Sequence, residues 1–137
     1  MKNYIDILQG IVNVDDLDDY DHLAMPNYLK IINESTIVLS NKVFGEINLN
    51  NNYSKRFVAA RCNLEFKNEL LLGKMWKLNA RLIELKDKYI NIDFRLRSEK
   101  QIKFKAIIVL VSFNLNSRKS EFLTAKEQYL LKDFFIK

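Results

Sequence analysis

Residues 16 to 28 read DLDDYDHLAMPNY, and no other stretch of the chain indicates as much about its fold and function. Four carboxylates and the only histidine lie within the first seven residues, and the only proline follows at Pro26. Because proline favours the first turn of a helix, the acidic loop precedes a helix N-terminus, where unpaired N–H groups and the positive end of the dipole converge. Such a place can stabilise a carbonyl oxygen that becomes negative. An acidic loop that only caps the helix is the alternative.

The residues after this loop predict a long amphipathic helix from Pro26 to Phe44. Its apolar positions recur at helical spacing and are Tyr28, Ile31, Ile32, Leu39 and Val43. Ser35 and Thr36 lie in the same stripe, and their small side chains would let a sheet approach closely. Gly45 is the expected C-terminal cap. At roughly 1.5 Å per residue the helix would be about 28 Å long, enough to cross a sheet.

Strand patterns flank the helix on both sides. Tyr4 to Val14 is an apolar run in which Gly10 indicates a bulge or a close backbone approach. Beyond an asparagine-rich tip at residues 48–52, the one place where disorder is expected, the apolar period changes to two. The alternating apolar faces are Val58, Ala60, Cys62, Leu64 and Phe66, then Trp76, Leu78, Ala80 and Leu82, then Ile90, Ile92, Phe94 and Leu96. Cys62 therefore reads as a core residue.

The C-terminal third predicts one more strand and a short helix. Ile102 to Leu115 is apolar on both faces through its middle, and Thr124 with Glu127 forms a capping box at the start of a helical tail. The elements together predict an α+β fold in which about five antiparallel meander strands, joined by turns at 71–74, 86–88 and 98–100, cover one long helix. The 137 residues suffice for a single domain, 1–137. An open sheet edge favours dimerisation by edge pairing.

Composition narrows the function classes. Hydrophobic residues make up 48% of the chain and charged residues 28%, as in an ordinary globular protein. The aliphatic run Ala106 to Val111 is far shorter than a membrane span, so no membrane partner is expected. Met1 to Asp6 does not begin an apolar signal segment, and one cysteine fits a reducing compartment, which indicates a cytoplasmic protein.

The basic residues are scattered although the net charge is +5, and no aromatic ladder accompanies them, so nucleic acid is not the expected partner. A basic excess suits a ligand that carries phosphates. One histidine and one cysteine cannot form a zinc set, and three isolated glycines form no phosphate loop. Neither a metal nor a cofactor is predicted.

The spacing of Asp16, Asp18, His22 and Tyr28 resembles the signature of the hotdog-fold acyl-CoA thioesterases, the 4-hydroxybenzoyl-CoA thioesterase superfamily. Their pattern is roughly Asp-x-Asp-x-x-Gly-(His/Ile)-x-x-x-x-x-Tyr, followed by a long central helix. The segments 69–73 and 116–120 resemble two of the family's turns. The sequence departs from the pattern where Asp21 replaces the glycine and Ala24 replaces a frequent asparagine. Aspartate tolerates the left-handed region better than most residues, so the turn can survive this change.

The resemblance implies a curled antiparallel sheet wrapped around the central helix, with subunits that pair as a homodimer or homotetramer. It implies hydrolysis of an acyl-CoA or acyl-carrier-protein thioester. Asp18 would act as nucleophile or general base. His22 would donate to the thioester oxygen through its side chain or its backbone N–H. Asp16 is expected to shape the turn, and Asp19 is the rival to Asp18.

The resemblance also implies residues that bind the substrate. Asp21, Leu23 and Tyr28 are expected near the acyl group. Lys86 and Lys88 occupy the turn where some members of the family place basic residues against the nucleotide phosphates, and Arg118 is a second choice.

The sequence leaves open three alternatives to thioester hydrolysis by Asp18. A hydratase or dehydratase on the same fold would need a catalytic histidine with a carboxylate partner, and His22 is the only candidate. A non-catalytic hotdog protein would bind acyl-CoA without turnover, which the missing motif glycine allows. A nucleophilic Cys62–His22 pair is the third, although nothing adjacent in the sequence supports it.

Overall fold

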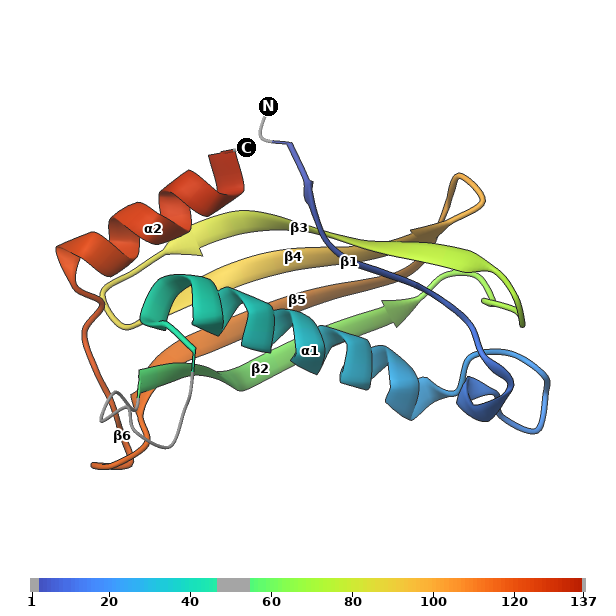
Figure 1. The fold of residues 1–137 in the computed structure, drawn as a ribbon, viewed down its shortest axis with the longest axis horizontal. Coiled ribbons are helices and arrows are strands. Elements are labelled where there is room, and N and C mark those ends of the chain that lie inside the picture. The colour runs from blue at the N-terminus through green and yellow to red at the C-terminus, as the bar shows by residue number, and fades with distance from the viewer. Residues whose placement is uncertain (1–2, 47–54, 137) are drawn as a thin grey trace.

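A computed structural model describes residues 3–46 and 55–136, in which an antiparallel sheet curls around one long helix (Figure 1). The asparagine-rich tip, where disorder is expected from the sequence, lies outside these residues. The elements are β1 (Ile5–Ile11), a 3₁₀ turn η1 (Val14–Asp16), α1 (Met25–Phe44), β2 (Lys55–Phe66), β3 (Met75–Leu85), β4 (Tyr89–Ser98), β5 (Gln101–Asn114), β6 (Lys119–Ser120) and α2 (Ala125–Ile136). The predicted α+β arrangement is confirmed, with β1 ending earlier than expected because Val14 begins η1.

The strand order is β1-β3-β4-β5-β2, with the short β6 paired to the end of β5. Strands β3, β4 and β5 form the predicted meander, but β2 pairs with β5 and not with β3. The expectation of a continuous meander is therefore wrong at the link between β2 and β3. The N–H groups of Lys67 and Asn68 both donate to the carbonyl of Lys103, at 2.9 and 3.2 Å, and direct the link across the end of β5.

The core lies between α1 and the sheet face that curls toward it. The stripe predicted for α1 is buried, and Ser35 is fully buried within it, so small side chains do let the sheet approach. The hydroxyls of Ser35 and Thr36 donate to the carbonyl of Ile32 within the helix, at 2.7 and 3.1 Å, and need no other partner. The facing sheet residues that are completely buried include Leu78, Ala80, Ile90, Ile92, Phe94, Phe104 and Leu110.

Two glycines, Gly45 and Gly10, have structural roles that the sequence predicted. Gly45 ends α1 with φ +89° and donates its N–H to Asn41, which confirms the cap. At Gly10 the close approach is the correct alternative, because a Cβ there would lie 2.6 Å from Cζ2 of the Trp76 ring. The bulge of β1 falls instead between Asp6 and Leu8.

Strand β2 forms an exposed edge of the sheet, which corrects the expectation for Cys62. Cys62 pairs with Ile108 on the inner face, as the alternation predicted, yet its side chain is exposed. Residues 59–63 are all exposed, and β2 is the last strand in the sheet order, so no neighbouring strand lies beyond it among the described residues. An alternating pattern identifies a face but not what covers it.

The C-terminal helix α2 lies near one end of the sheet, beside β3 (Figure 1). The predicted capping box is present: Thr124 N–H donates to Glu127 Oε1 at 2.9 Å, and Glu127 N–H donates to Thr124 Oγ1 at 3.1 Å. The same Glu127 oxygen accepts from Lys55 Nζ of β2 at 2.6 Å. Leu131 is fully buried and fixes the helix to the core. Within the described residues, neither helix has the length and hydropathy needed to span a membrane.

Candidate active site

The loop before α1 is held in place by the backbone of Asp16. Its carbonyl accepts from the N–H of Ala24 and from Nδ2 of Asn27, each at 2.9 Å. Its carboxylate accepts from the N–H of Asn13 at 3.0 Å. These bonds tie both ends of the loop together, so Asp16 shapes the turn, as the sequence predicted.

Asp18 and His22 lie side by side across this loop. Asp18 N–H donates to the His22 carbonyl at 2.9 Å, and Asp18 Oδ1 accepts from the N–H of Tyr20 at 2.8 Å and more weakly from that of His22 at 3.4 Å. The second carboxylate oxygen lies 3.4 Å from His22 Nδ1. Both side chains are about one-third exposed, 28% for Asp18 and 33% for His22. The pair therefore combines a carboxylate with an imidazole whose Nε2 is directed away from it.

Asp21 occupies a left-handed position, with φ +64°. Its N–H closes the turn onto the carbonyl of Asp18 at 3.2 Å. The geometry that a glycine usually provides is thus kept by an aspartate. The Asp21 side chain is exposed and does not line the cavity described below, so the structure does not bring it to the predicted substrate position.

The N-terminus of α1 keeps an unpaired donor. The N-cap residue is Ala24, which has no side chain to cap the helix, and Pro26 has no N–H. Asn27 N–H donates to the Ala24 carbonyl at 2.9 Å. Met25 N–H is left without an acceptor among the described residues. A free N–H at the positive end of a 20-residue helix suits an oxygen that gains negative charge.

A cavity of about 440 Å³ opens beside these groups. It is lined by Asp18, Tyr20, His22, Leu23, Met25, Tyr28, Phe66, Lys67, Asn68 and Glu69. Asp19, the rival of Asp18, is exposed and does not line it. Six lining residues were not predicted as site residues: Tyr20, Met25 and residues 66–69. Residues 66–69 reach the cavity through the β2–β5 pairing and the link that follows, and no local sequence signal placed them beside residue 18.

Aromatic rings form the apolar wall of this cavity. Tyr28 is only 4% exposed, stacks on Phe104 with ring centroids 4.9 Å apart, and meets Phe66 edge-on at 5.3 Å. Burial, and secondly the nearby Asp18 carboxylate, raise the pKa of the Tyr28 hydroxyl. Leu23, buried and bonded through its N–H to the Leu70 carbonyl at 2.8 Å, completes the wall.

The predicted nucleotide-binding residues lie at the other end of the sheet. His22 pairs with Leu71 just before β3, whereas Lys86 and Lys88 follow the end of that 11-residue strand. At roughly 3.3 Å per residue, β3 is about 33 Å long, and this length separates the two lysines from His22. Lys86 pairs with Glu84, and Lys88 lies over a phenylalanine ring. Arg118 is in the turn after β5, at the same distant end.

Cys62 lines a different cavity, of about 410 Å³, between α1 and β2. His22 is not among its lining residues, so the structure does not form the Cys62–His22 pair. No group of three potential metal ligands occurs among residues 3–46 and 55–136.

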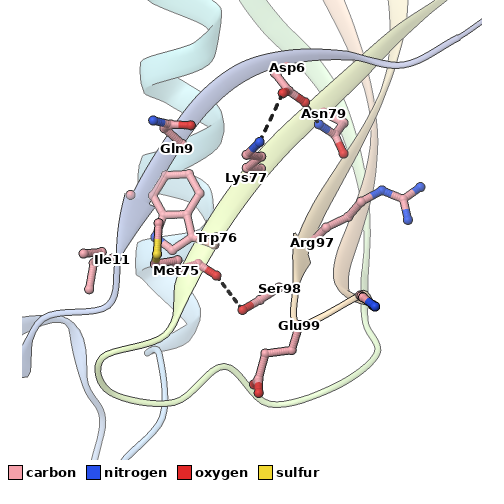
Figure 2. A pocket seen from close by; sticks show the side chains of 12 residues that line it. Asp6, Gln9, Ile11, Met75, Trp76, Lys77, Asn79, Arg97, Ser98 and Glu99 are labelled. Carbon is pink, nitrogen blue, oxygen red and sulfur yellow. Dashed lines mark hydrogen bonds and ion pairs between the residues drawn. The ribbon is translucent and has the colours of Figure 1, made fainter.

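Another cavity, of about 530 Å³, is lined by residues of β1, β3 and the β4–β5 turn (Figure 2). One ion pair lies within it: Lys77 Nζ is 3.7 Å from the Asp6 carboxylate, which also accepts from Asn79 (Figure 2). Ser98 donates to the Met75 carbonyl at 2.6 Å (Figure 2). Because no carboxylate–imidazole pair or free helix N-terminus lines it, this cavity is not the candidate active site.

Comparison with known proteins agrees with this geometry. Residues 12–127 match the thioesterase-like superfamily. No curated protein matches the sequence. Among solved structures, SAV2348 of Staphylococcus aureus, in complex with CoA, superposes with a TM-score of 0.86 at 13% identity, over 98% of this chain and 85% of that one.

Two further solved structures are similar. A thioesterase of Thermus thermophilus, complexed with CoA and Zn, has a TM-score of 0.79 at 17% identity, over 95% of this chain and 99% of that one. BH1999, a gentisyl-CoA thioesterase, has a TM-score of 0.77 at 18% identity, over 90% of this chain and 97% of that one. At such identities the likeness establishes the fold, which is the predicted hotdog fold, and the sequence match extends from the residue after β1 to the first turn of α2. The chain with the Asp18–His22 loop at its helix N-terminus therefore belongs to the thioesterase-like superfamily.

Proposed function

We propose that this protein hydrolyses an acyl-CoA thioester, with Asp18 as general base or nucleophile. The observation that carries the proposal is the position of Asp18 and His22 in a cavity beside the uncapped N-terminus of α1. The family supports thioester hydrolysis in general. CoA is favoured over a carrier protein as the thiol because two similar structures contain it.

The chemistry follows from the groups in the cavity. Asp18 Oδ2 removes a proton from water that attacks the thioester carbonyl, or attacks that carbon itself and forms a mixed anhydride which water then hydrolyses. In either case the carbonyl oxygen becomes negative, and we propose that the free N–H of Met25 stabilises it. The carbon–sulfur bond breaks, the departing thiolate takes a proton, and the products are the free acid and CoA. We propose that His22 Nε2 delivers that proton.

We further propose that the active form is a homodimer paired through the β2 edges. Residues 59–63 of β2 are exposed, and the neighbouring side of α1 exposes Leu29 and Ile37. The 410 Å³ cavity between α1 and β2 opens on this side. Phe66 of the candidate site is 49% exposed at the end of the same strand. Pairing the edges would cover this apolar surface and bring a second subunit to the open side of the site.

Thiol release from a panel of acyl-CoA esters tests the proposal. The panel contains short, long-chain and aromatic acyl groups, and free CoA is detected with a thiol reagent. We expect catalysed release from at least one ester, at a rate proportional to enzyme concentration. No release from any member, with CoA binding intact, would contradict hydrolysis and favour the non-catalytic alternative.

A hydratase or dehydratase is the second candidate, because His22 does have a carboxylate partner, Asp18, at 3.4 Å. Crotonyl-CoA separates the two functions. Hydration removes the absorbance of its conjugated double bond and releases no thiol, whereas hydrolysis releases CoA. We expect thiol release without prior loss of the double bond.

A further inference from the structure

Among the described residues, the hydroxyl of Tyr28 has no hydrogen-bond partner, although the side chain is buried. Its ring is packed between Phe104 and Phe66, and the whole residue is 4% exposed. No described residue hydrogen-bonds to the hydroxyl, yet it is not enclosed by protein like the buried unpaired atoms elsewhere in the molecule. Tyr28 lines the 440 Å³ cavity, and the hydroxyl is the one polar side-chain atom that it can present there. A buried phenol normally finds a hydrogen-bond partner, so this one is available to a ligand.

The position of Tyr28 on α1 directs this hydroxyl toward the reacting groups. Tyr28 lies three residues after Met25, on the same side of the helix, and helical side chains point back toward the N-terminus. The hydroxyl is therefore on the side of the free Met25 N–H. Asp18 is close enough for its charge to raise the pKa of the phenol, which keeps the proton on the oxygen.

We infer that the Tyr28 hydroxyl donates a hydrogen bond to the thioester carbonyl oxygen, as the second donor beside the Met25 N–H. The inference rests on the proposed function and adds a catalytic residue to it. Two donors from one helical turn would hold the carbonyl with its carbon facing Asp18. As negative charge develops on the oxygen, both bonds strengthen, so the effect falls mainly on the rate of turnover.

The test compares Tyr28→Phe with a matched variant, Tyr4→Phe. Phenylalanine keeps the stacking on Phe104 and Phe66 and removes only the donor. Tyr4→Phe also removes one hydroxyl, which donates to Asp93 Oδ2 at 2.6 Å on the other face of the sheet. We expect Tyr28→Phe to lower kcat about 10- to 100-fold and to raise KM by a smaller factor, and Tyr4→Phe to leave both unchanged. An unchanged kcat for Tyr28→Phe would overturn the inference.

A binding measurement separates hydrogen bonding from packing and does not need turnover. The probes are an acyl-CoA analogue in which CH₂ replaces the sulfur, which keeps the carbonyl, and the S-ethyl thioether of CoA, which lacks it. We expect Tyr28→Phe to weaken the ketone analogue about 5- to 10-fold in calorimetry and to leave the thioether unchanged. Equal losses for both probes would mean that Tyr28 only packs, and failure of the wild-type protein to bind the ketone would also overturn the inference.

The two proposals fail in different ways. Should the wild-type protein hydrolyse no ester but bind the ketone through Tyr28, the proposed function falls and the carbonyl donor stands. Should Asp18→Asn abolish turnover while Tyr28→Phe changes neither kcat nor ketone binding, the function stands and the donor falls.

Discussion

Asp21 holds a left-handed backbone conformation, φ +64°, at the position where the family usually has glycine. We predict that Asp21→Gly raises the free energy of unfolding by up to about 1 kcal/mol, because glycine adopts this region without the steric cost of a Cβ. Thermal unfolding measures the change. The matched control is Asp19→Gly, an exposed neighbour outside the left-handed region, which should be neutral or destabilising. Equal effects of the two substitutions would show that the conformation is not strained.

Local signals were sufficient for several single residues. Asp16 shapes the turn and Gly45 caps the helix, as predicted, because both roles depend on atoms within a few positions. The aromatic partners of Tyr28 could not be predicted in the same way. Phe66 and Phe104 meet it only after β2 pairs with β5, and that pairing joins segments about 40 residues apart.

At the scale of elements, α2 is fixed to β2 by a buried ion pair. Lys55 and Glu127 have side chains 6% and 8% exposed, and their charged atoms are 2.6 Å apart. We predict that Glu127→Gln lowers the free energy of unfolding by about 3 kcal/mol, because it leaves the buried Lys55 ammonium without its main counter-ion. Urea unfolding measures this loss.

Two further variants test whether the ion pair is the cause. Glu121, 3.8 Å from the same ammonium and 46% exposed on its side chain, provides the control, and Glu121→Gln should cost little. The double variant Lys55→Met with Glu127→Gln should lose less stability than Glu127→Gln alone, since it leaves no buried charge unpaired. A double variant that is as unstable as the sum of the single losses would contradict the account.

The periodicity of the apolar residues predicted the helices and strands, but it did not predict which strands pair with one another. The helix, the strands and the capping box of α2 follow from spacing along the chain. The neighbours of β2 do not, because two consecutive strands pair by default and nothing near residues 67–74 signals a crossing of the sheet end. The prediction that Cys62 is a core residue was wrong for a related reason. Its side chain lies on the inner face of the sheet, but β2 is an edge strand and the side chain stays exposed.

At the scale of the whole molecule, the proposed homodimer predicts the behaviour of Cys62. Partial burial raises the pKa of its thiol, so less thiolate is present at a given pH. We predict slow reaction with a thiol reagent at about pH 8, with the rate still rising above the ordinary thiol pKa of roughly 8.5. The rate should increase on dilution below the dimer dissociation constant, as the β2 edge becomes exposed. A sedimenting monomer at micromolar concentration with full activity would contradict the dimer.

The proposed dimer would also bring Lys86 and Lys88 of one subunit near the nucleotide of a substrate bound beside Asp18 of the other. Lys86 and Lys88 are far from Asp18 in one subunit, but edges paired about a two-fold axis run antiparallel and bring the partner's distant end to the site. We predict that Lys86→Ala with Lys88→Ala raises KM for acyl-CoA severalfold and spares a pantetheine thioester, which lacks the nucleotide. The control is Lys67→Ala, within the cavity, which should affect both substrates. Equal losses for both substrates with the double variant would remove these lysines from nucleotide binding.

Asp18 is the residue proposed to perform the chemistry, and the steady-state rate of Asp18→Asn measures its contribution. The amide keeps the size of the side chain and an oxygen that can accept from Tyr20 N–H, but it is neither a base nor a useful nucleophile. We expect a loss of kcat of about 1,000-fold or more, with acyl-CoA binding and thermal stability nearly unchanged, and full activity for Asp19→Asn. An Asp18→Asn variant that retains most of the wild-type rate would contradict the role proposed for Asp18.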